Sequence, residues 1–153
     1  MLMVLGVLCL GTFLIAAFTW SSLSTATKDP KEVSLGAPTV DEWSDASFFE
    51  AGEDYNVTVP VSYNYHGQDS ITYYVKVVAT AGSGTIQPSD FEITLSGDIS
   101  GSFTQGPAGT WISTSIVVTT GNPNDVFTIK IIPSVGAIDL SDVSFTITAE
   151  SAA

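Results

Sequence analysis

The first 27 residues carry no charged side chain, and Met1 to Trp20 form a nearly continuous apolar run. Twenty apolar residues in an α-helix rise about 30 Å, which matches the hydrocarbon layer of a bilayer. A helix that is apolar on every side must be buried all round, either by lipid or by other helices. The sequence therefore predicts an N-terminal apolar α-helix over residues 1–27, separate from the core of whatever follows.

The residues that flank this segment do not fit a simple export signal or membrane anchor. A signal peptide opens with basic residues, which Met1 to Val4 lack, and Ser24-Thr25-Ala26 matches a cleavage site only loosely. An anchor needs cations on its cytoplasmic side, but Lys28 and Lys31 lie on the C-terminal side. We expect instead that a basic leader is removed and that Met1 is the mature N-terminus. An anchor and an uncleaved signal stay open as alternatives.

Small residues in the segment predict close helix packing, because they let neighbouring helices approach. A spacing of four places Thr12, Ala16 and Trp20 on one face of a helix. The predicted packing residues are Gly6, Gly11, Thr12, Ala16 and Trp20. Cys9, the only cysteine, lies mid-helix as a small apolar residue, so no intrachain disulfide can form.

Roughly 120 residues follow this segment, which suffices for one domain. The chain has 16 acidic residues against four lysines, a formal net charge of −12, so a nucleic-acid partner is not expected. Charged residues make up only 13% of the chain, against about 25% in typical domains. A neutral, hydroxyl-rich and weakly acidic surface suits an extracellular module.

From residue 39 onward the pattern is that of strands, because apolar and polar residues alternate with period two between Gly, Pro, Asn and Asp turns. The clear runs begin at Val57, Ile71, Phe91, Trp111, Val126 and Val143, and fainter ones lie at 32–35 and 101–105. About seven or eight strands in one domain predict an antiparallel sandwich of immunoglobulin-like type. Pro60 lies within a run, which predicts an edge or a bulge there. Residues 28–38, with Pro30 and a Gly36-Ala37-Pro38 break, are the predicted connector, and 39–153 form the outer domain.

Residues that could carry chemistry are few, so we expect no enzyme, no catalytic residue, no cofactor and no metal. His66 is the only histidine and lies in a turn. Acidic clusters at 41–45, 50–54 and Asp139/Asp142 could hold Ca²⁺, yet none matches the EF-hand pattern and acidic turns are usually solvated. Asn56-Val57-Thr58 is a glycosylation sequon, with Asn56 the acceptor if the domain is extracellular.

Tyrosines are concentrated in one hairpin region, at positions 55, 63, 65, 73 and 74. Alternation places Tyr73 and Tyr74 on opposite faces of their strand, so we expect at least one of them at a surface or an interface. A role in the core or in subunit contacts is the simpler interpretation, and carbohydrate binding is the alternative.

An uncharged apolar helix, a short polar connector and an all-β domain together resemble archaeal type IV pilins and archaellins. The resemblance covers the whole chain in plan, and its residue-level part is the character of Met1–Thr27. Leu5 stands where bacterial type IV pilins have glutamate, which favours the archaeal branch. The resemblance implies an extracellular filament for adhesion or motility, inserted in the cell membrane before assembly. Helices would bundle in its core as a self-associating helical homopolymer, with the β-domains exposed.

Two alternatives stay open. Gly11-Thr12-Phe13 and Ala17-Phe18-Thr19 loosely resemble the export region of TasA/camelysin-like fibre proteins. That resemblance implies cleavage near residues 17–26 and a mature N-terminus that donates a strand to a neighbour. The other alternative is a membrane-anchored, ligand-binding sandwich that does not polymerise.

Overall fold

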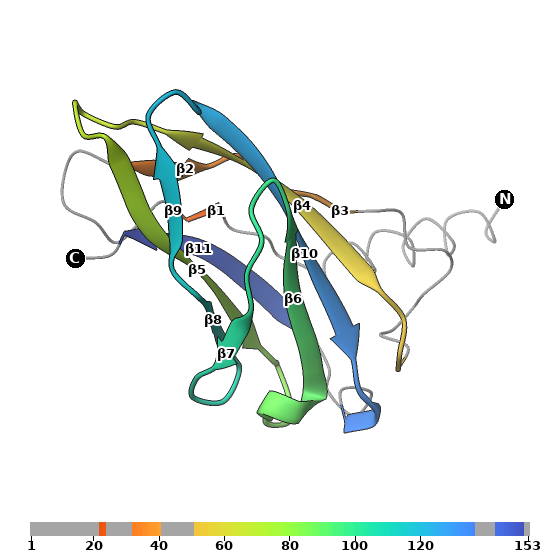
Figure 1. Cartoon of the computed structure of the whole chain (residues 1–153). Helices are drawn as coiled ribbons and strands as arrows, with labels where there is room; N and C mark the ends of the chain where they lie inside the picture. The colour runs from red at the N-terminus through yellow and green to blue at the C-terminus, as the bar shows by residue number, and fades with distance from the viewer. Residues whose placement is uncertain (1–21, 24–31, 41–50, 137–142, 152–153) are drawn as a thin grey trace, which may run out of the picture.

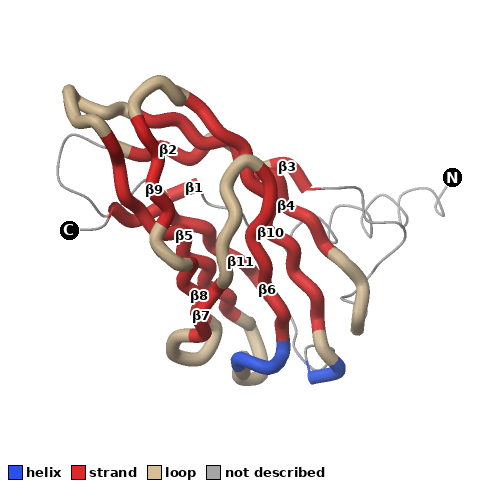
Figure 2. The backbone as a smooth tube through the Cα atoms, in the orientation of Figure 1, coloured by secondary structure: helices blue, strands red, loops and turns tan. Residues whose placement is uncertain are grey.

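The computed structural model describes residues 22–23, 32–40, 51–136 and 143–151 of the chain. These residues form eleven strands in two facing sheets (Figure 1). In the described part of the chain, helical turns lie only at the start of β6 and the end of β10 (Figure 2), the first being a 3-10 turn at Pro88–Asp90. This part of the chain is therefore all-β.

One sheet has six strands, in the order β1-β11-β5-β8-β7, with β9 also paired to β5. All its pairs are antiparallel except β1 with β11, which is parallel. Its strands are β1 (Ser22–Leu23), β5 (Ser70–Thr80), β7 (Phe103–Gln105), β8 (Thr110–Ser113), β9 (Ile116–Thr119) and β11 (Ser144–Ser151).

The second sheet has five strands, all paired antiparallel, in the order β2-β4-β10-β6, with β3 also paired to β4. Its strands are β2 (Val33–Leu35), β3 (Thr39–Val40), β4 (Tyr55–Tyr63), β6 (Phe91–Gly97) and β10 (Asn124–Pro133). Pro60 lies where the partner of β4 changes from β2 to β3. A proline fits there because no ladder bond needs its missing N–H, and its carbonyl still accepts from Gly36 N at 2.7 Å.

The core lies between the two sheets, and alternation along the strands builds it. In β4 and β5 nearly every second side chain is buried. Phe91 of β6 makes edge-to-face contacts with Trp111 of β8 and Phe145 of β11, at centroid distances of 6.2 and 5.1 Å. These three rings join the two sheets through favourable aromatic geometry.

The prediction of an apolar α-helix attached to the sandwich is wrong for this structure, although a two-sheet β-sandwich is present. No α-helix occurs among the residues that the structure describes, and Ser22–Leu23, inside the expected helical span 1–27, are a strand. Hydropathy cannot separate the two states here, because Ser, Thr and Leu near residue 22 suit a strand as well as a helix. Residues 1–20 lie outside the described part of the chain.

Within the described ranges, no helix is long and apolar enough to cross a membrane. The expected connector, residues 28–38, contains β2, which pairs with β4 over Tyr63 to Val61. The expected strand from Trp111 to Thr120 is two strands, β8 and β9, both paired to β5.

Candidate functional site

The structure places one of the site residues expected from the sequence. Asn56 is half-buried on β4, in register with Lys130 of β10, so the sequon lies in a strand and not in a loop. The five expected helix-packing residues lie outside the described residues: Gly6, Gly11, Thr12, Ala16 and Trp20.

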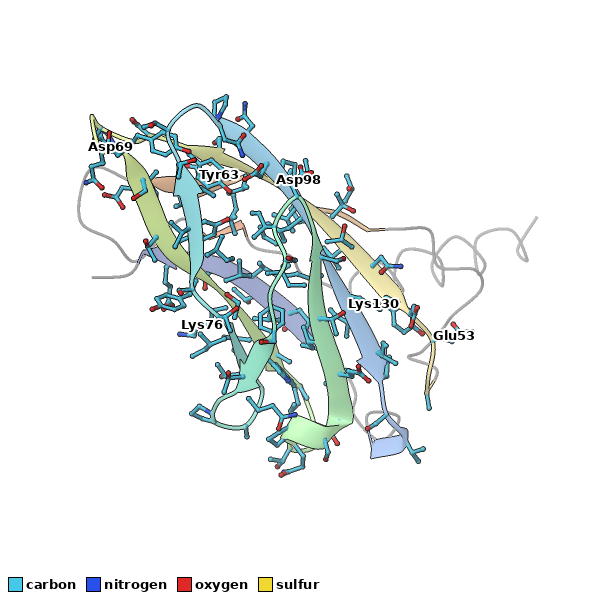
Figure 3. The ribbon with its side chains drawn as sticks, in the orientation of Figure 1. Glu53, Tyr63, Asp69, Lys76, Asp98 and Lys130 are labelled. Atoms are coloured by element: carbon cyan, nitrogen blue, oxygen red, sulfur yellow. The ribbon has the colours of Figure 1, made fainter. Side chains whose placement is uncertain are left out.

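The acidic clusters do not form a metal site in the part that the structure describes. Asp54 forms an ion pair with Lys130 at 2.7 Å, close to the exposed Glu53 (Figure 3). No group of three His, Cys, Asp or Glu side chains suitable for a metal occurs among the described residues. Residues 41–50, Asp139 and Asp142 lie outside them.

Two of the hairpin tyrosines, Tyr63 and Tyr73, form a hydrogen-bonded network with Asp125 at the opposite end of β4 from Lys130 (Figure 3). The Tyr63 hydroxyl donates to Asp125 Oδ2 at 2.9 Å and lies 2.9 Å from the Tyr73 hydroxyl. Because Tyr63 has one proton and gives it to the carboxylate, Tyr73 is the donor between the two rings. Asn122 Nδ2 donates to Asp125 Oδ1 at 2.6 Å, so both oxygens of this nearly buried carboxylate accept a bond.

Burial is the largest cause of the raised pKa of Tyr63 and Tyr73. The nearby Asp125 charge also raises both pKa values, since a phenolate there would face a like charge. The two tyrosine hydroxyls therefore stay protonated. Both hydroxyls and both carboxylate oxygens of Asp125 have hydrogen-bond partners within the protein. Such a network stabilises the fold and leaves no free nucleophile or base.

His66 also lacks the surroundings of a catalytic base. It lies in the exposed turn after Tyr65, with a φ of 48°, and Asn64 Oδ1 accepts a hydrogen bond from its backbone N–H at 3.4 Å. No geometry for acid–base or nucleophilic catalysis is found among the described residues. The features that remain are two open edges of the sandwich.

The first open edge is the outer side of β11. Among the described residues, only Ser22 and Leu23 pair there, in parallel with Ile147 and Thr148, whereas β5 pairs with β11 over its whole length. An incompletely paired edge strand exposes backbone N–H and C=O groups that can bind another extended segment.

The second open edge is a groove of about 900 Å³ between β6 of one sheet and β7–β8 of the other. On its outer side β6 has one isolated bridge, Leu95 to Gly101, in the described part of the chain. Buried apolar side chains line the groove, together with half-buried Phe103 and exposed Val135. Among its lining residues are Phe91, Ile93, Phe103, Trp111, Pro133 and Val135.

Sequence reasoning missed both edges. Which strands lie at an edge depends on sheet order, and strand periodicity carries no information about sheet order. The one usable signal was the weak strand 101–105, since short strands are typical of sheet edges.

No protein-family model and no curated protein significantly matches the chain. Among solved structures, it is similar to the chitin-binding domain of a hyperthermophilic chitinase from Pyrococcus furiosus. That alignment has 19% identity, covers 80% of this chain and 93% of the other, and has a TM-score of 0.34. A similarity this low carries no argument about function.

Proposed function

We propose that this chain is a non-enzymatic structural subunit of an extracellular filament, in which copies are joined by strand addition from the segment that contains β1. The apolar residues 1–20 would hold the subunit at the cell membrane before assembly. The proposal keeps the filament expected from the sequence and replaces a helical core with strand pairing between sandwiches.

The observation that carries the proposal is the contact between β1 and β11. Two residue pairs in parallel register hold β1, and parallel pairing is slightly less stable per residue than antiparallel pairing. Within the described residues the contact is short, which supports a segment that is held weakly in its own copy. The segment is thus suited to leave its own β11 and pair with an open strand edge of a neighbour.

Charge also favours this segment as the joining element. Copies with a net charge of −12 repel one another, whereas residues 1–27 are uncharged and can approach an acidic neighbour without that cost. An extended segment donated head to tail makes a heterologous contact that does not close, and repetition of such a contact gives a filament.

Negative-stain electron microscopy and sedimentation of the purified full chain test the proposal. A Ser22→Pro/Leu23→Pro variant removes both backbone N–H groups of β1, so we expect filaments to be lost while the melting temperature of the monomer stays nearly unchanged. A Ser22→Val/Leu23→Val control keeps both N–H groups and favours the extended state, so it should assemble. A wild-type chain that stays monomeric at every concentration would rule the proposal out.

A non-polymerising, ligand-binding sandwich is the second candidate, and the groove beside β6 favours it. Its volume of about 900 Å³ lies within the range of small-molecule sites, about 300–1,000 Å³. In that case ligand binding would persist in the double-proline variant, and no filaments would form from the wild type.

A further inference from the structure

The backbone of β6 presents hydrogen-bonding groups to the groove. Asp98 N donates to Val126 O at 3.0 Å and Ser134 N donates to Asp90 O at 2.7 Å, in the same register as the β6–β10 pairing. Even-numbered residues of β6 therefore make the bonds to β10. Ile93 lines the groove and is odd-numbered. Its backbone N–H and C=O groups therefore point away from β10.

A buried donor without an acceptor lies in the same groove. Trp111 is 2% exposed and lines it, and its Nε1 has no hydrogen-bond partner within the part of the chain that the structure describes. Buried indole N–H groups usually have an acceptor, because leaving one unpaired is costly. Because Nε1 itself is buried, a backbone carbonyl of an inserted segment would satisfy it once the side chains that cover it move aside.

The lining of the groove selects the kind of segment that fits. Val135 at the rim is 76% exposed, an unusual state for a large apolar side chain beside an apolar hollow. No Lys, Arg or His is among the described residues that line the groove, and the exposed acid among them is Glu92. The groove therefore suits an extended segment that is apolar and carries no negative charge.

We propose that the groove between β6 and β7–β8 is the acceptor for residues 18–27 of a second copy, the uncharged stretch that contains β1. The inference rests on the proposed function and adds where the donated strand goes. In a single copy β1 lies on its own β11, and in the filament the segment pairs with the β6 edge of the next subunit. A carbonyl of the donated segment accepts the Trp111 N–H.

Three full-length variants test the groove through the rate of filament growth. Val135→Glu places a charge at the rim, and we expect growth to slow at least tenfold. The matched control Val117→Glu changes a valine that is 61% exposed on β9, outside this groove, and should slow growth less than twofold. Trp111→Phe removes the N–H but keeps a ring against Phe91, so growth should slow about tenfold.

A fold defect would lower the melting temperature of the monomer as well as slow growth. Val135→Glu changes an exposed side chain, so its melting temperature should stay near that of the wild type, whereas Trp111→Phe leaves a cavity in the core and should lower it. Slower growth of Val135→Glu together with an unchanged melting temperature therefore identifies the groove as an assembly site.

Cross-linking between copies identifies the occupant. In a Cys9→Ser background, one protein carries Leu23→Cys and a second carries Val135→Cys. Each protein then has a single cysteine, so any disulfide must join two copies. Oxidation of mixed filaments should yield this heterodimer, and a Val117→Cys partner should give only background. Filaments that form without the cross-link would overturn the inference and leave the proposed function standing. Absence of filaments from the wild type would instead remove the proposed function.

Discussion

Tyr63 is the residue whose hydroxyl holds one end of the sandwich together. It links Tyr73 on β5 to Asp125 on β10, so it joins strands of opposite sheets through side-chain bonds. Both rings also pack at a centroid distance of 5.9 Å. Because the carboxylate is nearly buried, its bonds matter more than those of an exposed acid.

Tyr63→Phe should therefore lower the free energy of unfolding by about 2 kcal/mol, since it removes a charge-assisted bond and leaves Tyr73 without its acceptor. Tyr65→Phe is the matched control, because its hydroxyl donates to the carbonyls of Thr119 and Asn122 at an exposed site. Its cost should stay below about 1 kcal/mol. Urea unfolding measures the free energy of unfolding of both variants. Equal losses would show that the buried Tyr63–Asp125 hydrogen bond stabilises the fold no more than the exposed bonds of Tyr65.

At the scale of elements, the notable feature is the change of partner along β5. Lys76 to Val78 pair with β8, and Ser70 to Tyr73 pair with β9, so the ladder is interrupted between them. Ser113 fills the interruption, because its Oγ accepts from Val75 N at 2.9 Å and donates to Thr114 O at 2.8 Å. A side chain thus replaces a missing backbone partner.

Ser113→Ala should cost about 1–3 kcal/mol in the free energy of unfolding, because the buried Val75 N–H loses its acceptor. Hydrogen exchange at the Val75 amide is the direct readout, and its protection should fall more than that of the Val77 amide. A variant with unchanged exchange at Val75 would mean that another acceptor takes the place of Ser113.

Most strands of the sandwich could be predicted from sequence, because alternation from Val57, Ile71, Phe91, Phe127 and Val143 reports directly which face is buried. The split between β8 and β9 was not predicted, because the run from Trp111 was expected to be one strand. Trp111 and Ser113 are buried at odd positions, and Ile116 and Val118 at even ones, so the face reverses at Thr114–Ser115. A single strand cannot reverse its faces without an irregularity.

The edges and the groove could not be predicted from sequence, since they depend on long-range strand order. Ser22–Leu23 pair with residues 147–148, a separation that no local pattern reports. The chain from Met1 to Thr27 was expected to be helical because of its apolarity alone, and apolarity does not distinguish a helix from a buried strand.

The stability of the whole molecule should fall at alkaline pH, because Tyr63 and Tyr73 remain protonated in the fold well above their ordinary pKa of 10.0. Above about pH 10 the unfolded chain loses these two protons and the folded chain keeps them, so the unfolded state binds fewer protons. Each such group lowers the free energy of unfolding by about 1.4 kcal/mol per pH unit, and its contribution is complete below pH 10. Urea unfolding between pH 8 and pH 11 should show a plateau and then this decline. Tyr63→Phe removes one of these groups and should make the decline less steep, whereas an equal slope in both proteins would contradict the assignment.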